Sequence, residues 1–141
     1  MANPAPLNIV FFDVGGTLGE VETAAGRRRL RVFASTAGLL TALRQTLGLR
    51  IGVISNILDD MTTDDLRAML AEAGLTAMLD DSCIVTNKDA HVRKPCRKIY
   101  EFAARRAGVA IERCLYVGDE ADQVEGAQKA GMAGLLNPPN R

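Results

Sequence analysis

The chain has 141 residues and a mass of 15.1 kDa, which suits one domain, because a single hydrophobic core typically organises about 100 to 200 residues. Its 48% hydrophobic, 24% charged and 4% aromatic residues exclude a disordered, collagenous or disulfide-rich chain. Basic and acidic residues both number 17, so no positive surplus points to nucleic acid. No apolar run approaches the roughly 18 residues that cross a bilayer, and residues 1–7 lack a secretory signal pattern. We therefore expect a cytoplasmic protein that binds neither nucleic acid nor membrane.

The cysteines and the single histidine exclude two further classes. Cys83, Cys96 and Cys114 are widely spaced and form no CxxC pair, which argues against structural zinc. We expect Cys83 and Cys114 to behave as small hydrophobic residues at or beside buried strands. A serine or cysteine nucleophile generally needs a histidine base, and no nucleophile-elbow pattern surrounds His91.

Predicted strands and helices alternate along the chain. The apolar run 8–12 predicts a strand buried on both faces, and the apolar spacing over 39–47 predicts a helix that ends before Gly48. The later elements are strands over 50–55, 82–85, 114–117 and 133–136 and helices over 64–73, 97–107 and 122–130. This alternation predicts an α/β fold: one domain over 1–141, with a doubly wound, Rossmann-like parallel sheet and helices on both faces. Such sheets bind ligands at the carboxyl ends of their strands.

A small β-hairpin is predicted over about 18–33, between the first strand and the first helix, because strand-like segments 18–21 and 29–33 flank a turn at 23–26. It carries the densest charge cluster of the chain, which consists of Arg27, Arg28, Arg29 and Arg31. Two interpretations stay open. The arginines steer an anionic substrate, or they are solvated charges that protect the hairpin edge from pairing with other strands.

Polar residues at the ends of the predicted strands, or just before a helix, converge on one crevice: Asp13, Ser55, Asn56, Lys94 and Asp119. The Asp13 carboxylate can attack phosphorus or carbon, and Asp119 beside it can bind a cation that prefers oxygen ligands, as Mg²⁺ does. The Ser55 hydroxyl and the Asn56 backbone N–H would donate to phosphate oxygens. Lys94 would screen Asp13 and the negative charge of the transition state.

Four segments of the sequence closely resemble the four motifs of the haloacid dehalogenase superfamily of hydrolases. They are FFDVGGTL (11–18), VISN (53–56), RKPCRKIY (93–100) and YVGDEADQVEGAQKAGM (116–132). The resemblance extends from Ile9 to Asn137, and the predicted hairpin looks like the flap of that family. It implies the superfamily's fold and the activity of a phosphatase-like hydrolase.

The resemblance also implies roles for individual residues. Asp13 matches the nucleophile that forms an aspartyl phosphate, and Lys94 matches the lysine of the third motif. Asp119 matches a metal-binding acid, the backbone carbonyl of Gly15 matches a further Mg²⁺ ligand, and Asp13 is predicted to bind Mg²⁺ as well. The predicted phosphate-binding residues are Ser55, Asn56, Gly16 and Thr17.

Two positions depart from the family pattern. Most phosphatases of the family have a second aspartate, the general acid/base, where this chain has Gly15, and losing such a group commonly costs about 10²- to 10⁴-fold in rate. One hypothesis is that Gly15 has a positive φ, which would disfavour an aspartate there. The fourth motif usually has another acid several residues after Asp119. Here that stretch looks one residue short, so Asp122 or Glu120 is the candidate metal ligand and Gln123 lies nearest the expected place.

The segments between the motifs leave no room for a cap domain. Asp13 and Ser55 are 42 positions apart, and Ser55 and Lys94 are 39 apart, which the hairpin, two helices and a strand already use. We therefore expect a crevice open to solvent, which a protein partner or a second copy of the chain could cover.

Three functional hypotheses follow. The first is a Mg²⁺-dependent phosphohydrolase, weakened or partner-assisted because Gly15 replaces the acid, that acts on an unidentified phosphorylated substrate. The second is a catalytically degenerate module that binds phosphate or a protein. The third is a dehalogenase, which the missing second aspartate permits and the missing cap opposes. Metal dependence separates the first from the third, and turnover separates the first from the second.

Overall fold

A parallel sheet of five strands forms the centre of the computed structural model, which describes residues 6–137. The strands are β1 (Ile9–Phe12), β4 (Arg50–Ser55), β5 (Ile84–Thr86), β6 (Cys114–Gly118) and β7 (Ala133–Leu136). Their order is β5-β4-β1-β6-β7, and each neighbouring pair is parallel. The chain moves from β1 to one edge and then to the other, so the predicted doubly wound arrangement is confirmed.

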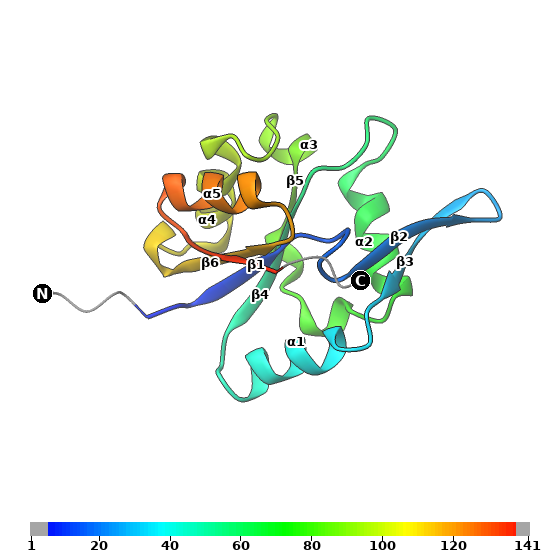
Figure 1. Ribbon diagram of the computed structural model, residues 1–141, viewed down its shortest axis with the longest axis horizontal. Coiled ribbons are helices and arrows are strands. Elements are labelled where there is room, and N and C mark those ends of the chain that lie inside the picture. Colours follow the sequence, from blue (N-terminus) through cyan, green and yellow to red (C-terminus); the bar gives the residue numbers. More distant parts are fainter. Residues whose placement is uncertain (1–5, 138–141) are drawn as a thin grey trace, which may run out of the picture.

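Helices cover both faces of this sheet (Figure 1). On one face, α1 (Thr36–Gln45) and α2 (Thr63–Glu72) pack against alternate strand residues such as Val10 and Phe12. On the other face, α4 (Arg97–Ala107) and α5 (Ala121–Ala130) pack against the residues between them, such as Ile9 and Phe11. Burial on both faces explains why the central strands are continuously apolar and do not alternate with polar residues.

The helix ends follow from local chemistry. At the start of α2, the Thr62 hydroxyl accepts from the Asp65 backbone N–H at 3.1 Å, and the Asp65 carboxylate accepts from the Thr62 N–H at 2.9 Å. This reciprocal cap satisfies N–H groups that the first helical turn leaves free. At the other end of a helix, Gly108 closes α4 with a φ of 70°, a conformation that glycine adopts without strain.

The segment around the third predicted strand differs from expectation. Residues Asp81–Cys83 form a single 3₁₀ turn, so β5 begins at Ile84 and not at residue 82. The turn forms because the Cys83 N–H donates to the Asp80 carbonyl at 2.9 Å. Directly after β5, the short helix α3 (Asn87–Ala90), which the sequence did not predict, is capped by Thr86.

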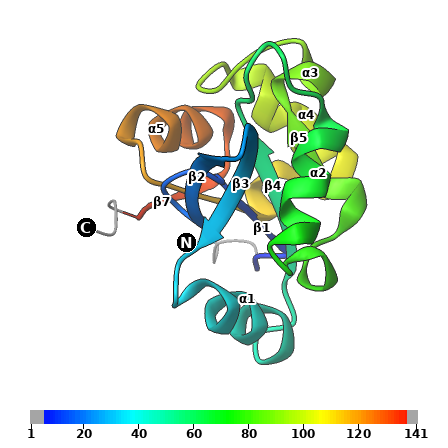
Figure 2. The same ribbon diagram turned by 90° about the vertical axis from the view of Figure 1, so that its right-hand side faces the viewer.

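The predicted hairpin is present as β2 (Gly19–Ala24) and β3 (Arg27–Val32), and it projects from the sheet beside α2 (Figures 1 and 2). Ion pairs join its arginines to α2 and to the loop before it. Arg27 and Arg29 lie 2.8 and 3.2 Å from the carboxylate of Glu72, and Arg28 lies 3.1 Å from that of Asp60. These contacts dock the hairpin on α2 and leave less unbalanced positive charge to steer a substrate.

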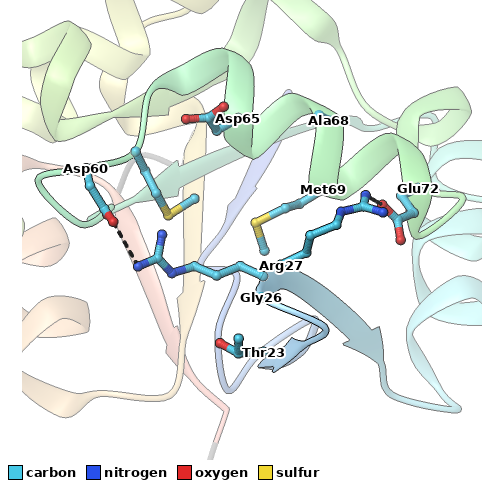
Figure 3. Close-up of a pocket in the computed structure, with 10 residues that line it drawn as sticks. Thr23, Gly26, Arg27, Asp60, Asp65, Ala68, Met69 and Glu72 are labelled. Carbon is cyan, nitrogen blue, oxygen red and sulfur yellow. Dashed lines mark hydrogen bonds and ion pairs between the residues drawn. The ribbon is translucent and has the colours of Figure 1, made fainter.

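A groove of about 390 Å³ lies between the hairpin and α2. The Arg27–Glu72 pair and Asp60 lie on its walls (Figure 3). Its lining residues are Thr23, Gly26, Arg27, Arg28, Asp60, Met61, Asp65, Ala68, Met69 and Glu72. None of them is a predicted catalytic, phosphate-binding or metal-binding residue, so the groove is separate from the crevice at the strand ends.

No helix within residues 6–137 is both long and apolar enough to cross a membrane. The predicted single domain over 1–141 includes residues 1–5 and 138–141, which lie outside the described residues.

Candidate active site

The loop after β1 turns sharply at the carboxyl edge of the sheet. The Asp13 N–H donates to the Val117 carbonyl of β6 at 2.9 Å, which fixes the start of the loop between two strands. The loop then passes through Gly16, whose φ is 83°, and the Gly16 N–H donates to the Gly19 carbonyl at 2.8 Å. This path leaves the Asp13 carboxylate at the sheet edge, with 12% of the side chain exposed.

Lys94 lies beneath Asp13 and forms a buried ion pair with it. The distance from Lys94 Nζ to Asp13 Oδ1 is 2.8 Å, and only 1% of the lysine side chain is exposed. Nζ also donates to the Ile54 carbonyl and to the Tyr116 hydroxyl, both at 2.8 Å. These three acceptors match the three N–H groups of a protonated ammonium. Burial lowers the pKa of Lys94, and the attraction and hydrogen bond of Asp13 oppose that effect.

Asn56 fixes the backbone of Lys94. Its Oδ1 accepts from the Lys94 N–H at 2.9 Å, and its Nδ2 donates to the Lys94 carbonyl at 3.1 Å. The prediction gave Asn56 only a backbone contact with phosphate, and this contact between side chain and backbone was missed. No local signal in the sequence reveals it, because the two residues are 38 positions apart.

Asp119 follows β6 and lies against both Asp13 and the Gly16 backbone. A Cβ atom placed on Gly16 would collide with the Asp119 carboxylate. Burial, together with a shared hydrogen bond and charge repulsion from Asp13, raises the pKa of Asp119 to about 6. Two carboxylates thus lie close together, with Lys94 as the cation that touches Asp13.

Two glycines provide a matched test of this close approach. Gly16 and Gly26 both have positive φ, but only Gly16 has a neighbour in the way, since nothing lies within 4 Å of a Cβ placed on Gly26. We expect Gly26→Ala to cost about 1–2 kcal/mol from the left-handed conformation alone. Gly16→Ala should cost more, because Asp119 must also move. Urea unfolding of both variants measures the difference, and equal losses would contradict the close packing of Asp119 on the loop.

The other predicted site residues lie around this pair. Ser55 ends β4 and is largely buried, and Gly15 is exposed at the rim. Gly15 does not have a positive φ, so the hypothesis of a left-handed Gly15 is wrong and the strained position is Gly16. The Thr17 hydroxyl is enclosed and has no hydrogen-bond partner among the described residues, so a phosphate could reach it only if its surroundings moved.

Asp122 is not brought together with Asp13 and Asp119. Helix α5 begins at Ala121, and Asp122 is exposed in its first turn. Across residues 6–137, no three histidine, cysteine or acidic side chains form a group that could hold a metal ion. Asp13 and Asp119 are therefore the two predicted acidic metal ligands that the structure brings together.

A family model for haloacid dehalogenase-like hydrolases matches residues 19–131. The chain belongs to this family. Over 108 residues, this haloacid dehalogenase-like hydrolase is 34% identical to a glyceraldehyde 3-phosphate phosphatase of Methanothermobacter thermautotrophicus. That match covers 76% of this chain and 45% of the relative, so the chain spans less than half the length of that curated relative.

Solved structures of the family share the fold. A HAD family hydrolase of Deinococcus radiodurans, solved with bound phosphate and sodium, matches with a TM-score of 0.72 and 21% identity over 97% of this chain and 84% of that one. The L-2-haloacid dehalogenase of Xanthobacter autotrophicus matches with a TM-score of 0.65 and 26% identity over 77% of this chain and 40% of the dehalogenase. Haloacid dehalogenase-like hydrolases of different activity thus resemble this chain.

Proposed function

We propose that this chain is a phosphohydrolase that transfers the phosphoryl group of an ester to Asp13 and then to water. The observation that carries the proposal is the buried ion pair between Lys94 Nζ and Asp13 Oδ1 at 2.8 Å, with Asp119 beside it at the strand ends. The similarity to a named phosphatase supports a phosphorylated substrate.

Covalent transfer uses Asp13 in two steps. In the first, the Asp13 oxygen that Lys94 does not hold attacks phosphorus, and the bond from phosphorus to the ester oxygen breaks. In the second, water attacks the aspartyl phosphate, which releases inorganic phosphate and restores the carboxylate. Lys94 fixes the orientation of Asp13, and the Ser55 hydroxyl donates to a phosphate oxygen as negative charge builds up.

The crevice offers a donor set that suits Mg²⁺. This ion prefers oxygen ligands, binds through one or two carboxylates and keeps several waters. Asp13 and Asp119 supply two adjacent carboxylates, and burial together with the hydrogen bond and the repulsion from Asp13 raises the pKa of Asp119 to about 6. The Gly15 carbonyl, two residues after Asp13, would be a third oxygen ligand. When bound there, Mg²⁺ would neutralise charge on the transferring phosphoryl group.

The absence of an acid at Gly15 limits which substrates this mechanism serves. Without a positioned proton donor, the leaving oxygen departs as an anion or takes its proton from solvent. The proposal therefore favours esters whose leaving group has a low pKa, such as aryl phosphates, over simple alkyl phosphates.

A panel of phosphate esters assayed with and without Mg²⁺ tests this function. We expect phosphate release that requires Mg²⁺ and becomes faster as the pKa of the leaving group falls. Tight binding of phosphate without turnover would instead support the degenerate binding module, which the replacement of the general acid by Gly15 favours. Metal-independent release of halide from a 2-haloacid would support the dehalogenase, which the similarity to the Xanthobacter autotrophicus enzyme favours.

Magnesium should also change the stability of the protein. Because Asp13 and Asp119 repel each other, we expect millimolar Mg²⁺ to raise the Tm of the wild type by mass action on the folded state. Asp119→Asn should raise the Tm without metal, since it removes one of the two charges, and should abolish the response to Mg²⁺. Differential scanning fluorimetry measures both. A wild-type Tm that ignores Mg²⁺ would contradict the proposed metal site.

The cysteines support the proposed location of this activity. Cys83, Cys96 and Cys114 are free thiols. Free thiols persist in reducing compartments. We include the cytoplasm in the proposal on this ground.

A further inference from the structure

A chain of hydrogen bonds leads from the buried Lys94 ammonium through Tyr116 and Gln123 to the exposed Glu120. The Tyr116 hydroxyl accepts from Lys94 Nζ at 2.8 Å and lies 3.3 Å from Gln123 Oε1. Because the ammonium of Lys94 can only donate, the single proton of the hydroxyl is free to donate to Gln123. Gln123 Nε2 in turn donates to Glu120 Oε2 at 2.6 Å, which fixes the orientation of the amide.

We propose that Tyr116, oriented by Gln123, is a positioning residue that holds the ammonium of Lys94 against Asp13. The inference rests on the proposed function for its catalytic meaning. The claim that Tyr116 restrains Lys94 Nζ does not depend on the proposed function, because it rests on the three hydrogen bonds of Nζ.

Lysine needs such a restraint more than most residues. Its long side chain has many rotamers, and an ammonium has no preferred direction of its own. Asn56 fixes the backbone of Lys94, whereas among residues 6–137 the ammonium is held by Asp13, the Ile54 carbonyl and Tyr116. Without the Tyr116 hydroxyl, Nζ loses one of two contacts that are independent of Asp13, and one buried N–H lacks an acceptor.

The same contacts give a role to a residue that departs from the family pattern. Gln123 lies nearest the place where the fourth motif usually has an acid, and its amide faces both Tyr116 and Glu120. A neutral amide can accept from Tyr116 and donate to Glu120 at the same time, whereas an ionised carboxylate could only accept. The Gln123 side chain therefore helps to orient Tyr116, which contacts Lys94.

The kinetic test compares three variants on an aryl phosphate. Tyr116→Phe removes only the hydroxyl, and we expect kcat to fall about tenfold with an unchanged KM, since the loss concerns orientation of the nucleophile and not substrate contact. Gln123→Leu keeps similar volume and should give a smaller loss of kcat. The control is Thr41→Val on α1, across the sheet, whose hydroxyl contacts Met78 Sδ at 3.3 Å and whose loss should leave kcat unchanged.

A second measurement does not depend on turnover. In protein labelled with ¹⁵N-lysine, an ammonium with three buried hydrogen bonds exchanges slowly with water and gives a resolved NH₃⁺ signal, which Lys94→Met assigns by its disappearance. We expect this signal to broaden or shift in Tyr116→Phe and to stay unchanged in Thr41→Val. If the wild type has no phosphatase activity but the signal changes in Tyr116→Phe, the proposed function is overturned and the positioning of Lys94 by Tyr116 is supported. An unchanged signal in Tyr116→Phe would overturn the positioning, and so would an unchanged kcat in an active enzyme.

Discussion

Asp13→Asn is expected to reduce phosphate-ester hydrolysis by at least about 10³-fold, because the amide is nearly the same shape as the carboxylate but cannot act as the nucleophile. The amide oxygen can still accept from Lys94, so we expect the variant to fold. Its Tm should nevertheless fall, because the charge of Asp13 no longer offsets the burial of Lys94. Relief of the repulsion between Asp13 and Asp119 opposes this loss in part.

Steady-state rates on an aryl phosphate with Mg²⁺, together with circular dichroism and thermal melting, check this prediction. Asp59→Asn is the matched control, since it makes the same chemical change in the exposed loop after β4. It should leave the rate close to that of the wild type. An Asp13→Asn variant that hydrolyses the ester at the wild-type rate would exclude a covalent aspartyl phosphate.

The sequence predicted the sheet well because its strands are short apolar runs, and those at the centre are buried on both faces. The bounds predicted for β4 and β7 agree with the structure, as does the helix over 97–107 that ends at Gly108. Around β5 the prediction failed, since the turn at Asp81–Cys83 depends on a backbone hydrogen bond that residue type does not reveal. Apolar patterns thus predicted the core better than the irregular connections.

The sequence likewise predicted some features of the candidate site and missed others. Asp13, Ser55 and Asp119 end strands that the sequence predicts, so topology alone brings them to one edge. The contacts of Asn56 and Tyr116 with Lys94 depend on tertiary packing between residues 38 and 22 positions apart. The one sequence signal for Tyr116 was a residue with a polar tip inside an otherwise apolar strand, and such a residue needs a buried partner.

Gly15→Asp is expected to raise phosphatase activity, because it supplies the acid that the family pattern has and this chain lacks. The structure favours the substitution in two respects. Gly15 does not have a positive φ, and the nearest atom to an added Cβ is Val21 Cγ2 at 3.7 Å, an ordinary contact. The position is also exposed at the rim of the crevice, so the new carboxyl group can be hydrated when no substrate is bound.

Electrostatics sets the cost of the substitution. A third carboxylate would join Asp13 and Asp119, where the pKa of Asp119 is already raised to about 6 by burial and by Asp13. Further negative charge should raise it more and lower the stability of the metal-free protein. Mg²⁺ and Lys94 would offset part of this repulsion. We therefore expect a lower Tm without Mg²⁺ and a larger rise in Tm when Mg²⁺ is added.

The expected gain in kcat is part of the 10²- to 10⁴-fold typical of general acid/base catalysis, and it should be largest for esters with poor leaving groups, which need the proton most. Gly15→Asn is the matched control, since it has the same shape without the acid and should give no gain. Rates for the three proteins on an aryl and an alkyl phosphate at matched Mg²⁺ test the prediction. A folded Gly15→Asp variant with no gain on either ester would mean that the limiting defect lies elsewhere. The stretch after Asp119 would then be the first candidate, because there Gln123 contacts Tyr116 and Glu120 where the family usually has an acid.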